Sequence, residues 1–270
     1  MRLALGACLL SAGLPLWAGQ PCAETPPPPE NLANAVTLAK RVADAADTMN
    51  DEVILIARVG QDLSKYGLYF SHMGFLVKDH PKGRWSVVHK LNECGTANSA
   101  LYDEGLTNFF SDNPVKYEGG LWRIKPEMQA RLKKALLSRK AEDFNQPAYS
   151  MLAYPFSEKY QNSNGWALEL LAFSLAPEYE ADTRKAAQSW LKQEQYVPTT
   201  LELGAGTRLG ARVTKANIAF DDHPDELRWN NKIQTVTVKS VMDWLERKEA
   251  CQDPLCAVTV ISASSDAGRR

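Results

Sequence analysis

Two histidines in one stretch of the chain are the first residues whose chemistry stands out. In residues 69–91 (YFSHMGFLVKDHPKGRWSVVHKL), His72 and His89 lie in two strand-like runs, and a loop with His80, a proline and a glycine joins them. This composition predicts a β-hairpin. Side chains alternate faces along a strand, so pairing of the two runs can place both imidazoles on one face. Such a pair can act as a general base and the group that orients it.

A hydroxyl group precedes an unusually apolar segment later in the chain. Residues 162–165 (NSNG) favour a helix start, and the following ten, WALELLAFSL, have only Glu169 and Ser174 as polar residues. A helix that is apolar all round lies inside a domain. Ser163 would then stand at the N-terminus of a buried helix, where the dipole and free N–H groups favour a nucleophile and an oxyanion. The alternative is a plain N-cap.

Together these residues predict a site for acyl transfer. Ser163 would attack, His72 would be the base, and His89 would orient His72 or stabilise its charged form. Substrate-binding residues are expected beside them, at Arg58, Gln61, Asp62 and Asn162. The alternative for the first three is that they only fix the loop before the hairpin.

Other reactive residues have less specific patterns. Cys94 follows His89 by five residues and is a second candidate nucleophile, or else a buried, disulfide-bonded or incidental cysteine. Cys251 and Cys256 are close enough to form a disulfide. The loop with Asp221, Asp222, His223 and Asp225 could bind a cation weakly or form a solvated turn. No metal-ligand spacing, phosphate loop or nucleotide motif is present, so we predict no metal and no cofactor.

The N-terminus indicates export. Residues 1–19 (MRLALGACLLSAGLPLWAG) have the pattern of a signal peptide. A retained membrane anchor is the alternative, but Pro15 interrupts a run that is shorter than the roughly 20 apolar residues needed to span a bilayer. We therefore predict a periplasmic or secreted protein with no stable transmembrane segment after cleavage. The net charge of −1 predicts no nucleic-acid partner.

The mature chain is long enough for one large domain. We expect a Pro-rich lead-in at residues 20–30, a single domain at residues 31–257 and a disordered tail at residues 258–270. Helices are expected at residues 31–49, 101–110, 126–138, 164–175, 178–195 and 240–248. Further strands are expected at residues 52–59, 120–124, 212–220 and 232–238, and Ser240 and Asp243 have the spacing of a capping box.

The same motifs carry a family resemblance. A histidine in FSH on one strand, a second in VVH on its partner and a later helix opening at Asn162 and Ser163 resemble the circularly permuted papain-like superfamily, which includes NlpC-type and lecithin:retinol acyltransferase-type domains. More narrowly, RVGQDLSKYGLYFSHMGF, VVHKLNECG and YQNSNGWALELLA are similar to an uncharacterised bacterial family of secreted proteins known as a domain of unknown function.

The resemblance implies an α+β, papain-like fold, in which an antiparallel sheet with the two-histidine hairpin packs on the buried helix. It places the catalytic histidine at His72, the second polar residue at His89 and the nucleophilic cysteine at Ser163. Because serine is far less acidic than cysteine, catalysis would depend heavily on His72. The predicted function is an exported hydrolase or acyltransferase for an amide, thioester or ester bond in an envelope peptide, glycan or lipid. The alternative is an inactive domain that binds such a molecule in its cleft.

Overall fold

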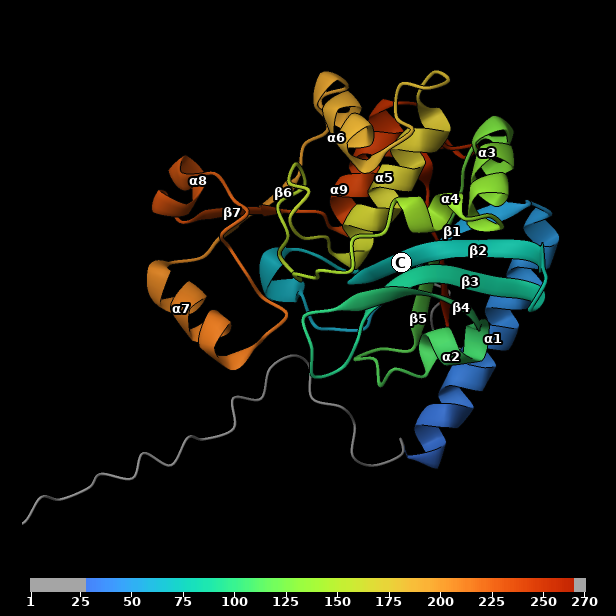
Figure 1. Cartoon of the computed structure of the whole chain (residues 1–270). Coiled ribbons are helices and arrows are strands. Elements are labelled where there is room, and N and C mark those ends of the chain that lie inside the picture. Colours follow the sequence, from blue (N-terminus) through green and yellow to red (C-terminus); the bar gives the residue numbers. More distant parts are fainter. Residues whose placement is uncertain (1–27, 265–270) are drawn as a thin grey trace, which may run out of the picture.

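The fold is α+β, as predicted, and its centre is an antiparallel sheet with helices on both faces (Figure 1). The computed structural model describes residues 28–264. The sheet order is β4-β3-β2-β1-β5-β8. Its strands are β1 (Val53–Arg58), β2 (His72–His80), β3 (Gly83–Asn92), β4 (Ser99–Gly105), β5 (Glu118–Arg123) and β8 (Thr259–Ser262).

The helices form one layer on each face of this sheet. On one side lie α3 (Pro126–Leu136), α4 (Lys140–Asp143), α5 (Ser163–Leu175), α6 (Arg184–Gln193) and α9 (Val238–Arg247). On the other side lie α1 (Pro29–Met49) and α2 (Leu106–Phe110). Two further helices, α7 (Ala205–Thr214) and α8 (Asp225–Trp229), accompany a second, two-stranded sheet of β6 (Thr199–Glu202) and β7 (Lys232–Thr235).

The central strand β1 shows why both faces are covered. All six of its residues are buried, as expected for a continuous apolar run. Val53 and Leu55 belong to the hydrophobic cluster under α3, α5 and α9, whereas Ile54 and Ile56 belong to the cluster under α1 and α2. Strand alternation therefore builds two cores from one segment.

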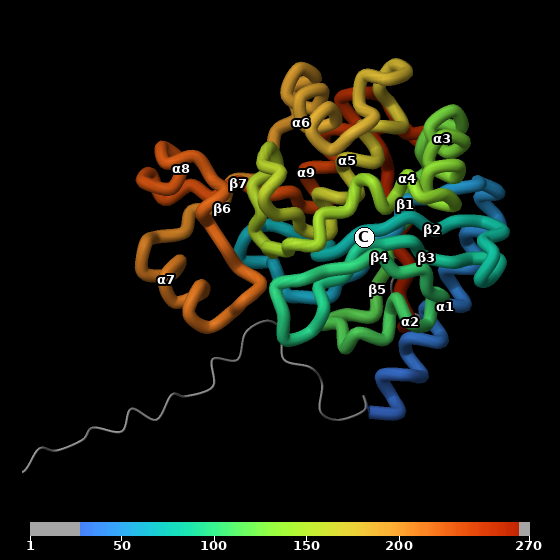
Figure 2. Tube along the Cα trace, viewed as in Figure 1, coloured from blue at the N-terminus to red at the C-terminus, as the bar shows by residue number. Residues whose placement is uncertain are grey.

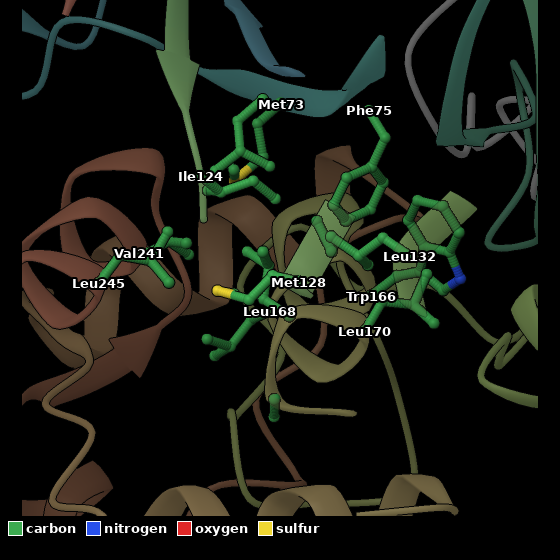
Figure 3. Packing of buried hydrophobic residues seen from close by; sticks show 14 of the residues in the cluster. Met73, Phe75, Ile124, Met128, Leu132, Trp166, Leu168, Leu170, Val241 and Leu245 are labelled. Carbon is green, nitrogen blue, oxygen red and sulfur yellow. The ribbon is translucent and has the colours of Figure 1, made fainter. Parts of the chain in front are cut away.

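The helix α5 lies in the larger core, as its apolar sequence predicted. Eleven of its thirteen residues are buried. Trp166 packs edge-on against Phe75 of the sheet, with 5.6 Å between ring centroids. Met73, Phe75 and Ile124 point from the sheet towards residues of α3, α5 and α9 (Figure 3).

The small sheet with α7 and α8 forms a lobe at one end of the molecule, separate from the main helical layers (Figure 2). Its apolar residues form a third cluster of their own, built around Leu201, Leu203, Phe220 and Ile233. This lobe borders the cleft described below.

Several predicted elements need correction. Residues 212–220 are not a strand, because α7 extends to Thr214 and a loop follows. Residues 101–110 are not one helix: β4 runs to Gly105 and only then does α2 begin. The first helical turn of α6 comes at Arg184, later than expected for residues 178–195, because residues 177–183 form turns.

The C-terminal elements also differ from the predictions. Thr237 is the N-cap of α9 and shares a capping box with Ser240, so Ser240 is the third helical residue and not the cap. The predicted disordered tail contains β8, whose residues pair with β5. The predicted signal peptide, the lead-in up to residue 27 and residues 265–270 lie outside the described part. Within residues 28–264, no helix has the length and hydropathy needed to cross a membrane.

Candidate functional site

A row of hydrogen-bonded ionisable side chains crosses the sheet from β2 to β4. The Nε2 atom of His72 lies 2.8 Å from Nδ1 of His89, and Nε2 of His89 lies 2.8 Å from Oε1 of Glu104. The predicted hairpin therefore places both histidines on one face, as expected. Gly74 makes room for this arrangement, because a Cβ atom there would lie 2.8 Å from Cβ of His89.

This row defines the tautomer of each imidazole. An ionised Glu104 can only accept a hydrogen bond, so Nε2 of His89 carries a proton and Nδ1 of His89 is an acceptor. His72 must then donate from Nε2, which leaves Nδ1 of His72 with a free lone pair. The hydrogen bond of the His72 side chain within residues 28–264 uses Nε2 and leaves Nδ1 available. We call this row, from Glu104 through His89 to His72, the relay. Its base is Nδ1 of His72, at the β2 end.

Arg58 extends the polar row by one strand and supplies a buried positive charge. It is the β1 partner of His72 in the sheet register. Its guanidinium pairs with Asp112 at 2.7 Å and lies over the ring of Phe109, 5.0 Å from the centroid. The ring of Phe109 also contacts both histidines. Arg58 Nε is buried and has no hydrogen-bond partner among the described residues.

Burial and charge keep both histidines neutral. The pKa of His72 is well below its ordinary value, because burial disfavours the cation, and the charge of Arg58 and electrostatic interaction with His89 add to this effect. Burial also lowers the pKa of His89, and Glu104 partly opposes the shift. At neutral pH His72 is therefore a neutral imidazole.

A cleft of about 550 Å³ opens at this end of the sheet. All of the predicted catalytic and substrate-binding residues except His89 line it: Arg58, Gln61, Asp62, His72, Asn162 and Ser163. His89 is fully buried and lies behind His72. Residues that are separated by about ninety positions in the sequence thus meet at one cavity.

Ser163 is the first helical residue of α5 and is not its cap. The N-cap is Asn162, whose Oδ1 accepts the backbone N–H of Gly165 at 2.7 Å, so the plain N-cap interpretation of Ser163 is wrong. The side chain of Asn164 ties the helix to the start of β2, because its Oδ1 accepts the N–H of Met73. The phenol of Tyr149 interacts with Ser163, which partly opposes the rise in the Tyr149 pKa caused by burial.

Ser163 and His72 reach the cleft from different sides of the sheet. The helix α5 packs on the face of Phe75, whereas His72 contacts Phe109 of α2 on the opposite face. Among the hydrogen bonds of the described residues, none joins Ser163 to His72. A direct proton transfer between them requires closer approach in a substrate complex.

The remaining candidates have structural partners. Cys94 is disulfide-bonded and therefore is not a free thiol nucleophile. Cys251 and Cys256 form a disulfide after α9. In the acidic segment, Asp222 lies 2.9 Å from Nδ1 of His223 and accepts the N–H of Tyr154. This segment is a partnered turn.

Sequence reasoning missed three residues of the site: Glu104, Asp112 and Tyr149. Glu104 is the most important, because it fixes the tautomers of the relay. Its only sequence signal is an alternating pattern in residues 99–105, and this pattern is interrupted by polar residues. Asp112 and Tyr149 lie outside the helices and strands, where periodicity gives no information.

The fold and the site define an α+β protein in which a carboxylate–histidine–histidine relay opens on a cleft. The chain belongs to the bacterial family described as uncharacterized protein conserved in bacteria (DUF2145), which matches residues 45–245. No curated protein and no solved structure matches the chain. The predicted membership of an uncharacterised bacterial family is thus confirmed, and the papain-like resemblance stays a prediction.

Proposed function

We propose that this protein is an acyl hydrolase or acyltransferase of the bacterial envelope in which His72 is the general base. The single observation that supports this most strongly is the relay from Glu104 through His89 to His72, which leaves an unprotonated nitrogen beside the cleft. A neutral, oriented imidazole is the state that a general base requires. The papain-like resemblance, which we also propose, assigns the same role to His72.

In the proposed mechanism, Ser163 is the nucleophile. Nδ1 of His72 removes the hydroxyl proton as the Ser163 oxygen attacks the carbonyl carbon, and the resulting oxyanion lies at the N-terminus of α5. The imidazolium of His72 then gives its proton to the leaving alcohol, thiol or amine as the scissile bond breaks. Water or a second acceptor, activated by the same base, releases the acyl group from Ser163.

Labelling with a fluorophosphonate probe tests this proposal. Purified protein is compared with the Ser163→Ala and His72→Ala variants and with a thiol-blocked sample. The control is Ser71→Ala, because Ser71 lines the same cleft but its hydroxyl accepts the N–H of Gly60 at 2.9 Å. We expect labelling to be lost in the first two variants and kept in the control and after thiol blocking. Labelling that depends on Ser71 alone, or no labelling of folded protein, contradicts the proposal.

A second candidate is a non-catalytic domain that binds peptide, glycan or lipid in the cleft. The approach of Ser163 and His72 from opposite faces of the sheet, without a mutual hydrogen bond, favours this alternative. It predicts that the His72→Ala variant still binds the ligand and that the unmodified protein turns over no acyl substrate.

The place of action is part of the proposal. The signal-peptide pattern and the three disulfide-bonded cysteines described above support an oxidising compartment such as the periplasm. The mass of the protein in a periplasmic extract tests it: a species that lacks roughly the first 19 residues is expected from the position of the cleavage pattern. An uncleaved protein confined to the cytoplasm would contradict export.

A further inference from the structure

The third hydrophobic cluster forms a wall of the cleft instead of being covered by other elements. Leu201, Leu203 and Phe220 are its buried members at the cleft. Four half-buried side chains that pack against them also line the cleft: Tyr66, Leu152, Ala211 and Ile218. A cluster that stays open to a cavity keeps apolar surface available for an apolar ligand.

The same cleft also contains polar groups. It is lined by Arg58, His72 and Ser163. The Arg58 Nε–H is a buried donor without a partner among the described residues, so it favours a ligand with a hydrogen-bond acceptor. The cleft therefore combines polar groups that suit a carbonyl or carboxylate with an apolar wall that suits an apolar chain.

We propose that the cleft binds a long, unbranched fatty acyl chain, with its carbonyl group at Ser163 and its methylene groups along Leu152, Leu203 and Ile218. The reaction at that carbonyl depends on the proposed function, but the binding of the chain does not. The side chains of Leu152, Leu203 and Ile218 offer no hydrogen-bond partner, so polar groups of a ligand placed against these three residues would lose water without compensation. A cleft of about 550 Å³ also falls in the size range of small-molecule sites.

Calorimetric titration of the Ser163→Ala variant with acetate, octanoate and dodecanoate tests the binding, because no turnover interferes. We expect the affinity to rise with chain length, by about three- to fourfold for each methylene that the cleft covers. Equal or absent binding of all three acids would overturn the inference, as would preferential binding of a polar peptide.

A matched pair of leucine variants locates the chain. Leu152→Asn places a polar group on the cleft wall, and we expect it to weaken dodecanoate binding at least tenfold and acetate binding little. Leu209→Asn is the control, because Leu209 is 66% exposed on α7 and does not line the cleft. Ile218→Asn is a second wall variant, and circular dichroism confirms that each protein is folded. An equal loss of dodecanoate affinity in Leu152→Asn and Leu209→Asn would contradict the proposed position of the acyl chain.

Measurement of ester and amide hydrolysis by the unmodified protein distinguishes the acyl-binding proposal from the catalytic proposal. It also identifies the kind of molecule that supplies the acyl chain. Dodecanoate binding without hydrolysis of any ester or amide would support the acyl site and overturn the catalytic function. Hydrolysis of acetyl and dodecanoyl esters at equal rates, without fatty-acid binding, would support the catalytic function and overturn the acyl site. A comparison of dodecanoyl glycerol with N-dodecanoyl glycine distinguishes a lipid ester from an acylated amine as the source.

Discussion

Glu104 is the residue that turns two neighbouring histidines into a directed relay. Without a carboxylate at Nε2 of His89, either nitrogen of that imidazole could carry the proton, and His72 would have no defined tautomer. The hydrogen bond from His89 to Glu104 removes this ambiguity. Glu104 contacts the base only through His89, so we assign it a positioning role.

The Glu104→Gln variant tests this role. We expect the rate of fluorophosphonate labelling to fall by about 100-fold, the scale of a lost general-base contribution, with dodecanoate binding unchanged. The ¹⁵N chemical shifts of His72 should change from one tautomer to a mixture. The control is Asp103→Asn, whose side chain pairs with Lys82 at 3.3 Å outside the relay. Unchanged ¹⁵N shifts in Glu104→Gln would contradict the role.

Lys90 is a buried basic side chain, and its effect is on stability. It has no exposed surface, and its Nζ donates to the backbone carbonyl of Gln146 at 2.8 Å. Burial, with help from the charge of Arg184, lowers the pKa of this amine from 10.5 to about 7. The folded protein therefore holds the amine largely neutral above pH 7, whereas the unfolded chain protonates it.

The pH dependence of unfolding follows from this difference. Between about pH 7 and pH 10.5 the unfolded state binds more protons at Lys90, so its contribution makes the free energy of unfolding rise with pH. We expect Lys90→Met to remove this part of the rise in urea titrations at pH 7, 8 and 9. Lys78→Met, on the neighbouring strand, is the control and should keep the full rise of the free energy of unfolding with pH. Equal slopes for the Lys90 variant and the unmodified protein would contradict the prediction.

At the scale of elements, the hairpin of β2 and β3 determines the geometry of the site. Its antiparallel register brings His72 and His89 onto the α2 face while Met73, Phe75 and Val88 fill the α5 core. The two imidazoles can approach only because position 74 lacks a side chain, since β2 and β3 are adjacent there.

Gly74→Ala is therefore expected to destabilise the hairpin. The new Cβ would lie 2.8 Å from Cβ of His89 and 3.0 Å from the carbonyl oxygen of Val88, and backbone cannot move aside cheaply. Overpacking of this kind costs about 1–3 kcal/mol, which thermal unfolding would measure. Gly105→Ala is the control, because a Cβ there meets no atom within 4 Å. A similar loss in both variants would rule out the close approach as the cause.

Elements with strong periodicity could be predicted from the sequence, and elements at sheet edges could not. The buried strand β1 and the largely buried helix α5 have continuous apolar runs, and α1 has an amphipathic pattern. The edge strands β4 and β8 are only partly buried, so their sequences lack a clear alternation. Among the site residues, His72, His89 and Ser163 stood out locally, whereas Glu104 required the register of β4.

At the scale of the whole molecule, the sheet joins the two ends of the described chain. The C-terminal strand β8 pairs with β5, and Arg41 of α1 donates to the carbonyl oxygens of Ser262 and Ser264 at 2.8 and 2.9 Å. The lobe of β6, β7 and α7 lies at the other end of the fold and borders the cleft. Residues 259–264 are thus part of the domain, which extends beyond the predicted boundary at residue 257.

Truncation after residue 258 tests this boundary. It removes the β8 ladder and both carbonyl acceptors of Arg41, and we expect a loss of about 2 kcal/mol on the usual scale of net hydrogen bonds. That corresponds to a fall of roughly 4–8 °C in Tm for a domain of this size. A chain that ends at residue 264 is the control and should melt like the full protein. Equal Tm values for both truncations would show that β8 contributes no stability.

The contact between α1 and β8 has a consequence for how relatives of this fold are recognised. Arg41 lies twelve residues into α1, so a linker of about 18 Å along the helix would connect the C-terminal strand to the start of α1. A chain closed in this way and reopened in the exposed segment before α5 would begin just ahead of α5, and the histidine hairpin would follow α5 in the chain. Every contact of the cleft would be preserved, although Ser163 would now precede the two histidines in the sequence. Relatives of this fold are therefore better recognised by the spatial arrangement of these residues than by their order along the chain.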